Sequence, residues 1–142
     1  MKTLKSIMLG LALLLVCGLA KANTTKDDDR STSDYAVNIF VDAMTHGKLA
    51  GLNEVLDKSV DFSMLRGKKV LSFNKNEMLD FFKSNKNIVQ ECTTSTSIVE
   101  SNSSIAIVKV AMKYDTFVRD NYVTLANTGN GWKITNVYSV FK

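Results

Sequence analysis

The arrangement of hydrophobic and polar residues changes along the chain from a helical period to a strand period. From Ser33 to near Gly47, apolar residues recur at spacings of three and four, which predicts a helix with one buried face. Ser33 or Asp34 can cap its beginning, and Gly47 suits the position after its last turn. The residues of the apolar face are Val37, Phe40, Val41 and Met44.

Shorter elements follow in the middle of the chain. An apolar stripe predicts a second short helix over Leu49 to Leu56, which would form a hairpin with the first. Strict alternation predicts a strand over Val60 to Met64, and a second extended piece covers Lys69 to Phe73. A third helix should begin after Asn74, because Glu77 stands three residues later and can complete a capping box.

The rest of the chain is predicted to be almost entirely strand, because it is rich in Val, Ile, Thr, Tyr and Phe. Short polar segments separate the strands, and Asn130-Gly131 suits a hairpin turn with positive φ at both central residues. Helices followed by long strands predict an α+β fold, in which the helices cover one face of a curved antiparallel sheet. The predicted strands are Ile88 to Glu100, Ile105 to Tyr114, Phe117 to Asn127 and Trp132 to Phe141.

The first 22 residues have the pattern of a cleavable signal peptide. Lys2 and Lys5 precede an uncharged apolar run from Ile7 to Ala20, and small residues suit cleavage after Ala22. We therefore expect export, to the periplasm or outside the cell. A membrane anchor is disfavoured, because about 14 apolar residues fall short of the roughly 20 that a spanning helix needs. Lipoprotein processing at Cys17 is the other alternative, disfavoured by the valine before it.

The predicted organisation is a signal peptide over residues 1–22, a flexible polar leader over 23–32 and one α+β domain over 33–142. Removal of the signal takes away three lysines and lowers the formal net charge from +4 to +1. The basic character of the precursor is therefore no evidence for nucleic-acid binding, and we expect neither a nucleic-acid partner nor membrane association after cleavage.

Metal and cofactor sites are not expected. The chain has a single histidine, His46, and the adjacent aspartates 27–29 lack the ordered, glycine-turned loop of a carboxylate cage. Phosphate-binding loops, nucleophile elbows and paired cysteines are absent from the sequence. Without Cys17, Cys92 has no partner for an intramolecular disulfide, and it faces either the core or a pocket.

From Ser33 to Lys142 the order of these elements resembles the nuclear transport factor 2-like superfamily, particularly exported bacterial members of the lumazine-binding-like and polyketide-cyclase-like groups. The segment from Phe40 to Lys48, the aromatic Phe62 and the closing strand that starts Gly131-Trp132-Lys133-Ile134 carry the resemblance. It implies a cystatin-like cone, in which a curved sheet wraps around the helices and leaves a pocket at the wide end. It also implies a homodimer through the sheet, which is common in that superfamily.

The favoured function is a non-catalytic module that binds a small apolar molecule or a protein partner. Aromatic side chains with a polar group are expected near the cavity, although they could equally pack the helices onto the sheet. An amide among apolar neighbours must also find a partner. The expected ligand-binding residues are Tyr114, Tyr122, Trp132, Asn136 and Tyr138.

The alternative is a small-molecule isomerase, dehydratase or cyclase. Enzymes that resemble this chain hold an acidic or histidine base in an apolar cavity beside a tyrosine or a protonated acid. Asp120, which shares a strand phase with Tyr122, could be such a base, although a surface charge is the favoured interpretation of Asp120. No catalytic residue is assigned.

Overall fold

The computed structural model describes residues 32–142. The predicted signal peptide and nearly all of the predicted leader lie outside the described residues and stay predictions.

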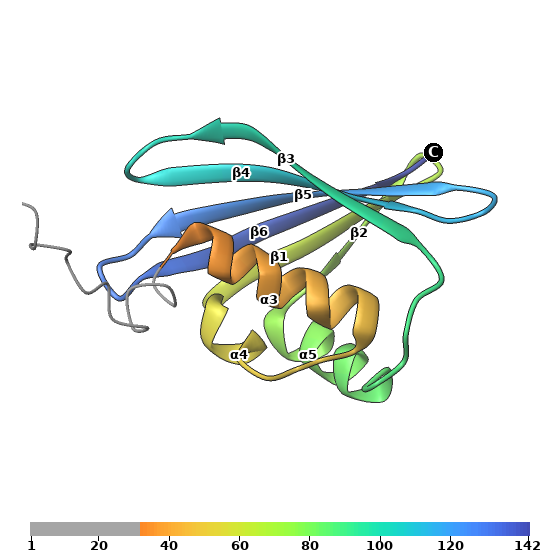
Figure 1. The fold of residues 1–142 in the computed structure, drawn as a ribbon, viewed down its shortest axis with the longest axis horizontal. Helices are drawn as coiled ribbons and strands as arrows, with labels where there is room; N and C mark the ends of the chain where they lie inside the picture. The colour runs from red at the N-terminus through yellow and green to blue at the C-terminus, as the bar shows by residue number, and fades with distance from the viewer. Residues whose placement is uncertain (1–31) are drawn as a thin grey trace, which may run out of the picture.

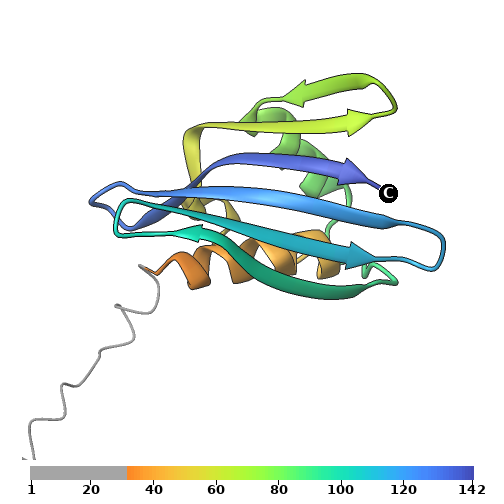
Figure 2. The ribbon, with the colours of Figure 1, turned by 90° about the horizontal axis from the view of Figure 1, so that it is seen from above.

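Three helices lie against one face of a six-stranded sheet (Figures 1 and 2). The strand order is β2-β1-β6-β5-β4-β3, so β2 and β3 form the two edges and the sheet does not close. The elements are α3 (Ser33–His46), α4 (Leu52–Val55), β1 (Leu56–Arg66), β2 (Lys69–Phe73), α5 (Lys75–Ser84), β3 (Thr93–Ser101), β4 (Ile105–Lys113), β5 (Val118–Asn127) and β6 (Trp132–Phe141).

One pair of neighbouring strands departs from the predicted antiparallel sheet. β1 runs parallel to β6, whereas the other four pairs are antiparallel. The chain leaves this neighbourhood after β2, crosses beneath the sheet as α5 and returns only with β6, so the direction of β6 is set by the intervening meander. Register shifts in β1, β3 and β6 bend the sheet around the helices, as bulges generally do.

The core lies between α3 and the inner, helix-facing side of the sheet. Alternate residues of β4 and β5 are buried, and Val110, Val123 and Leu125 have no exposed surface. Phe40 of α3 is equally buried and packs with them in one cluster. The period-two pattern predicted from the sequence therefore produces one apolar face, which α3 covers.

Local signals set the helix ends. The side chain of Thr32 accepts a hydrogen bond from the Tyr35 amide at 3.1 Å, so the cap lies one residue before the predicted Ser33. The capping box of Asn74 and Glu77 is confirmed at the start of α5. Gly47 ends α3 with φ 63°, as predicted.

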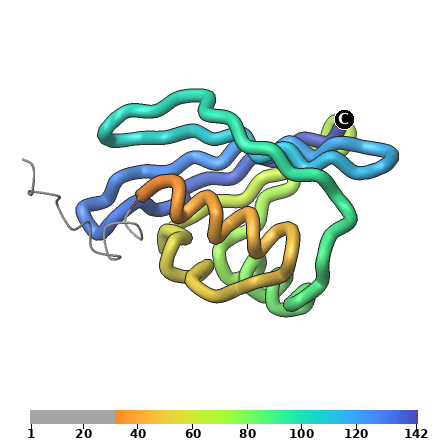
Figure 3. Tube along the Cα trace, in the orientation of Figure 1, coloured from red at the N-terminus to blue at the C-terminus, as the bar shows by residue number. Residues whose placement is uncertain are grey.

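The predicted strand from Ile88 begins only at Thr93, and this part of the prediction is wrong. The reason is a contact that is distant in sequence. The amide of Asn87 donates to the carbonyl oxygen of Gly47 at 3.0 Å, and the amide of Gln90 donates to that of Thr45 at 2.7 Å. Residues 85–92 are thus held by the end of α3, and Figure 3 traces them from α5 up to the edge of the sheet.

Two further boundaries differ from the prediction. The second helix is a single turn, and β1 already begins at Leu56, because Leu56 pairs with Ile134 of β6. In the last hairpin, positive φ occurs at Gly129 and Gly131 rather than at Asn130. Glycine adopts that conformation without the clash that a side chain brings.

Replacing Gly47 by alanine should destabilise the protein strongly. A Cβ atom there would lie 2.5 Å from the carbonyl oxygen of Asn85 and 2.5 Å from the amide nitrogen of Asn87, and φ is 63°. We expect Gly47→Ala to lower the free energy of unfolding by about 3 kcal/mol, measured by urea denaturation.

Gly67→Ala is the matched control. Gly67 has nearly the same φ, 64°, but nothing lies within 4 Å of the position that a Cβ atom would take there. Its free energy of unfolding should fall by only about 1 kcal/mol, because the variant has the unfavourable φ without the steric clash. Equal losses for the two variants would show that the contact between α3 and residues 85–92 adds nothing.

Candidate functional site

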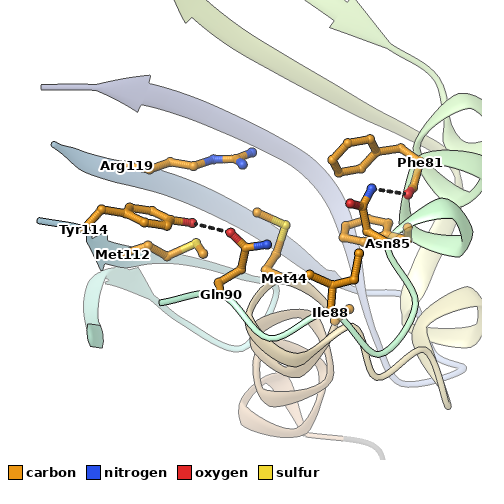
Figure 4. A pocket seen from close by; sticks show the side chains of 10 residues that line it. Met44, Phe81, Asn85, Ile88, Gln90, Met112, Tyr114 and Arg119 are labelled. Atoms are coloured by element: carbon orange, nitrogen blue, oxygen red, sulfur yellow. Dashed lines mark hydrogen bonds between the residues drawn. The ribbon is translucent and has the colours of Figure 1, made fainter. Parts of the chain in front are cut away.

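A cavity of about 80 Å³ opens where the end of α3, the end of α5 and residues 85–92 meet the inner side of β4 and β5. Most of its lining is apolar, and its four polar side chains come from residues 85–92, the end of β4 and β5 (Figure 4). The lining residues are Ala43, Met44, Phe81, Phe82, Asn85, Ile88, Gln90, Met112, Tyr114 and Arg119.

Two of the polar side chains are supplied by residues 85–92, and a third follows β4. The hydroxyl of Tyr114 donates to Oε1 of Gln90 at 3.2 Å, and Nδ2 of Asn85 donates to the carbonyl oxygen of Phe81 at 2.9 Å. Gln90 is placed by its backbone bond to the end of α3. The contact between residues 85–92 and the end of α3 therefore also positions the Gln90 side chain in the lining.

Arg119 is held by a network of neutral side chains on the inner side of the sheet. Its Nε donates to Oδ1 of Asn121 at 3.0 Å, and its Nη2 donates to Oγ of Ser139 at 3.2 Å. Ser139 in turn donates to Oδ1 of Asn121 at 2.7 Å, while Nδ2 of Asn121 donates to the carbonyl oxygen of Val110 at 3.2 Å. Asn121 and Ser139 are fully buried, so the network fixes the guanidinium from behind.

Burial shifts the pKa of the two ionisable residues that line the cavity. It lowers the pKa of the Arg119 guanidinium, an effect that Tyr114 partly opposes. It raises the pKa of the Tyr114 phenol, with a smaller contribution in the same direction from Cys92. Arginine remains charged in proteins, so at neutral pH the cavity presents a cation beside an uncharged phenol.

Three aromatic rings continue from the cavity toward solvent. Tyr114 stacks on Phe117 with ring centroids 4.4 Å apart, and Phe117 lies 6.2 Å from Phe141. The guanidinium carbon of Arg119 lies 5.5 Å from the centroid of Phe141. Phe117 and Phe141 are 39% and 41% exposed and also line a broader, shallower depression beside the cavity. We call Tyr114, Phe117 and Phe141 the aromatic rim.

The structure does not bring the five predicted ligand-binding residues together. Tyr114 lines the cavity, whereas Trp132 lines a separate depression beside α4. Tyr122 pairs with Tyr138 on the outer side of the sheet, because the neighbouring pair of Val123 and Val137 points into the core. Asn136 shares that outer side with them. Ligand binding by these residues stays a prediction.

Asp120 is not the surface charge that the sequence suggested, because only 2% of it is exposed. It lies on the outer side of the sheet, where Nζ of Lys142 is 2.6 Å and Nζ of Lys109 is 3.7 Å from its Oδ2. The hydrogen bond to Asp120 raises the pKa of Lys142. Successive strand residues point to opposite sides, so the sheet lies between Asp120 and the cavity that Arg119 lines.

Arg119 and Asn121 were missed in the sequence, although a signal for both exists. They share a strand phase with Val123 and Leu125, two core residues of β5 that are fully buried. A cation and an amide on the core phase of a strand are unusual, because buried polar groups need partners. Gln90 had no such signal, since it lies in the irregular segment.

Within residues 32–142, no group of three or more His, Cys, Asp or Glu side chains is placed to hold a metal ion. No helix in the same range is long and apolar enough to cross a membrane.

Asn121→Ala should destabilise the protein, because it leaves the Arg119 Nε, the Ser139 hydroxyl and the Val110 carbonyl without their partner. We expect a loss of about 2–3 kcal/mol in the free energy of unfolding, measured by urea denaturation. Asn136→Ala, on the half-buried outer side of β6, is the control and should lose less than about 1 kcal/mol. Similar losses in both variants would contradict the role given to the network.

Comparison with known proteins agrees with the fold. A family model described as "Putative lumazine-binding" matches residues 28–139. Among curated proteins there is no match. A solved NTF-2 like protein of unknown function from Silicibacter pomeroyi DSS-3 is similar with a TM-score of 0.66 at 15% identity, covering 84% of this chain and 100% of its own.

Two further solved structures have the same architecture. A cystatin-like fold protein from Burkholderia xenovorans LB400 has a TM-score of 0.60 at 12% identity, covering 82% of this chain and 93% of its own. A protein called a putative ketosteroid isomerase, from Parabacteroides distasonis ATCC 8503, has a TM-score of 0.56 at 11% identity, covering 87% and 92%. The match of the family model over most of the sequence shows that this chain belongs to the putative lumazine-binding family, and its fold is the nuclear transport factor 2-like fold.

Proposed function

We propose that this domain is a non-catalytic binding module that takes up a small molecule in the cavity lined by Tyr114 and Arg119. The observation that carries the proposal is the composition of the lining, in which apolar and aromatic side chains surround a few convergent polar groups. Small-molecule sites generally have this composition. The aromatic rim extends the apolar surface from the cavity to solvent.

The size of the cavity limits what can enter it. About 80 Å³ holds on the order of five water molecules, which corresponds to one small functional group or ring rather than a whole cofactor. A larger ligand would place one end in the cavity and the remainder against the aromatic rim. The proposed ligand is therefore small, or long with one compact end.

Binding is favoured over the isomerase, dehydratase or cyclase alternative. A general base must lie within hydrogen-bond reach of the substrate, but none of the ten lining residues is Asp, Glu or His. The hydroxyl of Tyr114 is bonded to Gln90 rather than to a carboxylate. The similarity to the protein called a putative ketosteroid isomerase, at 11% identity, supports a common fold, and a fold alone does not imply an activity.

Export and self-association remain parts of this proposal. Residues 1–22 support export to the periplasm or beyond the cell through their signal-like pattern. A homodimer is supported by apolar surface left uncovered on the outer side of the sheet. Val70 there is 52% exposed, and three more residues are only partly covered: Tyr122, Tyr138 and Val140. A protein partner on that side is the alternative.

Blocking the mouth of the cavity should remove ligand binding. Ile88 lines the cavity and is 49% exposed, so Ile88→Trp would fill the opening without disturbing the core. Benzamide and benzoate, two ring compounds of nearly equal size, serve as probes. We expect at least one to shift the backbone amide resonances of the lining residues in nuclear magnetic resonance titrations, and Ile88→Trp to weaken that binding by about tenfold or more.

Val89→Trp is the matched control, because Val89 is the next residue, is 63% exposed and does not line the cavity. The Val89→Trp variant should bind the probes with the affinity of the wild type. If neither probe shifts the lining amides, or if both tryptophan variants bind as the wild type does, the cavity is not the binding site.

A further inference from the structure

We propose that the part of the ligand that enters the cavity is an anion, specifically a carboxylate on an apolar ring, and that Arg119 binds it. This inference rests on the proposed function, because it names the chemistry of the ligand for that same cavity.

Arg119 has no counter-ion within the part of the chain that the structure describes. The ion pairs there join His46 to Asp42, Lys83 to Asp80, and both Lys109 and Lys142 to Asp120. The partners of Arg119 are the neutral side chains of Asn121 and Ser139. A mostly buried cation without an opposite charge is costly, and a bound anion would offset part of that cost.

The guanidinium still has donors for such an anion. Arginine has five N–H groups, and the bonds to Asn121 and Ser139 use one on Nε and one on Nη2. The two hydrogens of Nη1 and the second of Nη2 are the donors that remain, and a carboxylate can accept from both nitrogens at once. In Figure 4 the guanidinium extends from β5 toward Phe81, above Tyr114 and Gln90.

Gln90, beside Arg119 in the lining, also offers a donor to an anion. Oε1 of Gln90 accepts from Tyr114, so its amide nitrogen is left as a donor. No carboxylate lines the cavity to attract an ammonium group. The electrostatic preference therefore comes from one fixed positive charge with nothing negative beside it.

The surroundings of Arg119 favour an organic anion over a bare inorganic one. The aromatic rim lies directly beside the guanidinium, with Phe141 5.5 Å from its carbon. Phe81, 52% exposed, lines the cavity on the opposite side. A flat apolar ring that carries the carboxylate could rest on these aromatic surfaces, whereas inorganic phosphate could not use them.

The test compares benzoate with benzamide, which has the same shape without the charge. In the wild type at neutral pH, we expect benzoate to bind at least about tenfold more tightly than benzamide and to shift the Nε resonance of Arg119. Inorganic phosphate should bind more weakly than benzoate. In Arg119→Gln, benzoate and benzamide should bind with equal affinity, and Arg119→Lys should keep a reduced preference for benzoate.

Lys58→Gln is the control, because it removes the same charge from an exposed residue that does not line this cavity. It should keep the wild-type preference for benzoate.

Binding of benzoate no tighter than that of benzamide in the wild type would overturn the inference and leave the proposed function standing. That comparison needs only the wild type, so it holds even if Arg119→Gln fails to fold. A preference that persists in folded Arg119→Gln, or phosphate binding as tight as benzoate, would also overturn it. Failure of both ring probes to shift the lining amides would instead overturn the proposed function.

Discussion

The cavity depends on the attachment of residues 85–92 to the end of α3. Two backbone hydrogen bonds, from Asn87 to Gly47 and from Gln90 to Thr45, make this attachment. The approach is so close that only a residue without a side chain fits at Gly47. Because the same segment brings Asn85, Ile88 and Gln90 to the cavity, the glycine that ends the helix also determines the wall of the site.

The attachment of residues 85–92 stabilises the fold, whereas the network around Arg119 costs stability. Attaching residues 85–92 satisfies backbone groups, whereas burying a guanidinium against Asn121 and Ser139 lowers stability in order to hold a charge in place. A protein that needed only a stable core would have an apolar residue on this phase of β5, as it does at Val123 and Leu125. The cost is understandable if the fixed charge has a use, since preorganised groups bind a ligand without a further loss of conformational entropy.

Local patterns were sufficient to predict the α+β class, the capping of α5 at Asn74, the end of α3 at Gly47 and three of the four C-terminal strands. Local patterns failed for segments whose hydrogen-bonding partner lies far away in the sequence. Nothing near Ile88 indicates that the chain there bonds to α3, and nothing near β1 indicates that it runs parallel to β6. Of the predicted site residues, only Tyr114 lines the cavity, because an aromatic on a strand gives no indication of its side of the sheet.

The geometry of β5 explains why the charge in the cavity is not neutralised from within. Arg119 and Asp120 are adjacent in sequence, yet successive residues of a strand point to opposite sides of the sheet. Arg119 therefore meets Asn121 and Ser139 on the inner side, while Asp120 meets Lys109 and Lys142 on the outer side. The carboxylate on the outer side has two lysines beside it, and the sheet lies between it and the guanidinium. The strand thus keeps its own anion away from its partly buried cation, and within residues 32–142 no carboxylate pairs with Arg119 on the inner side.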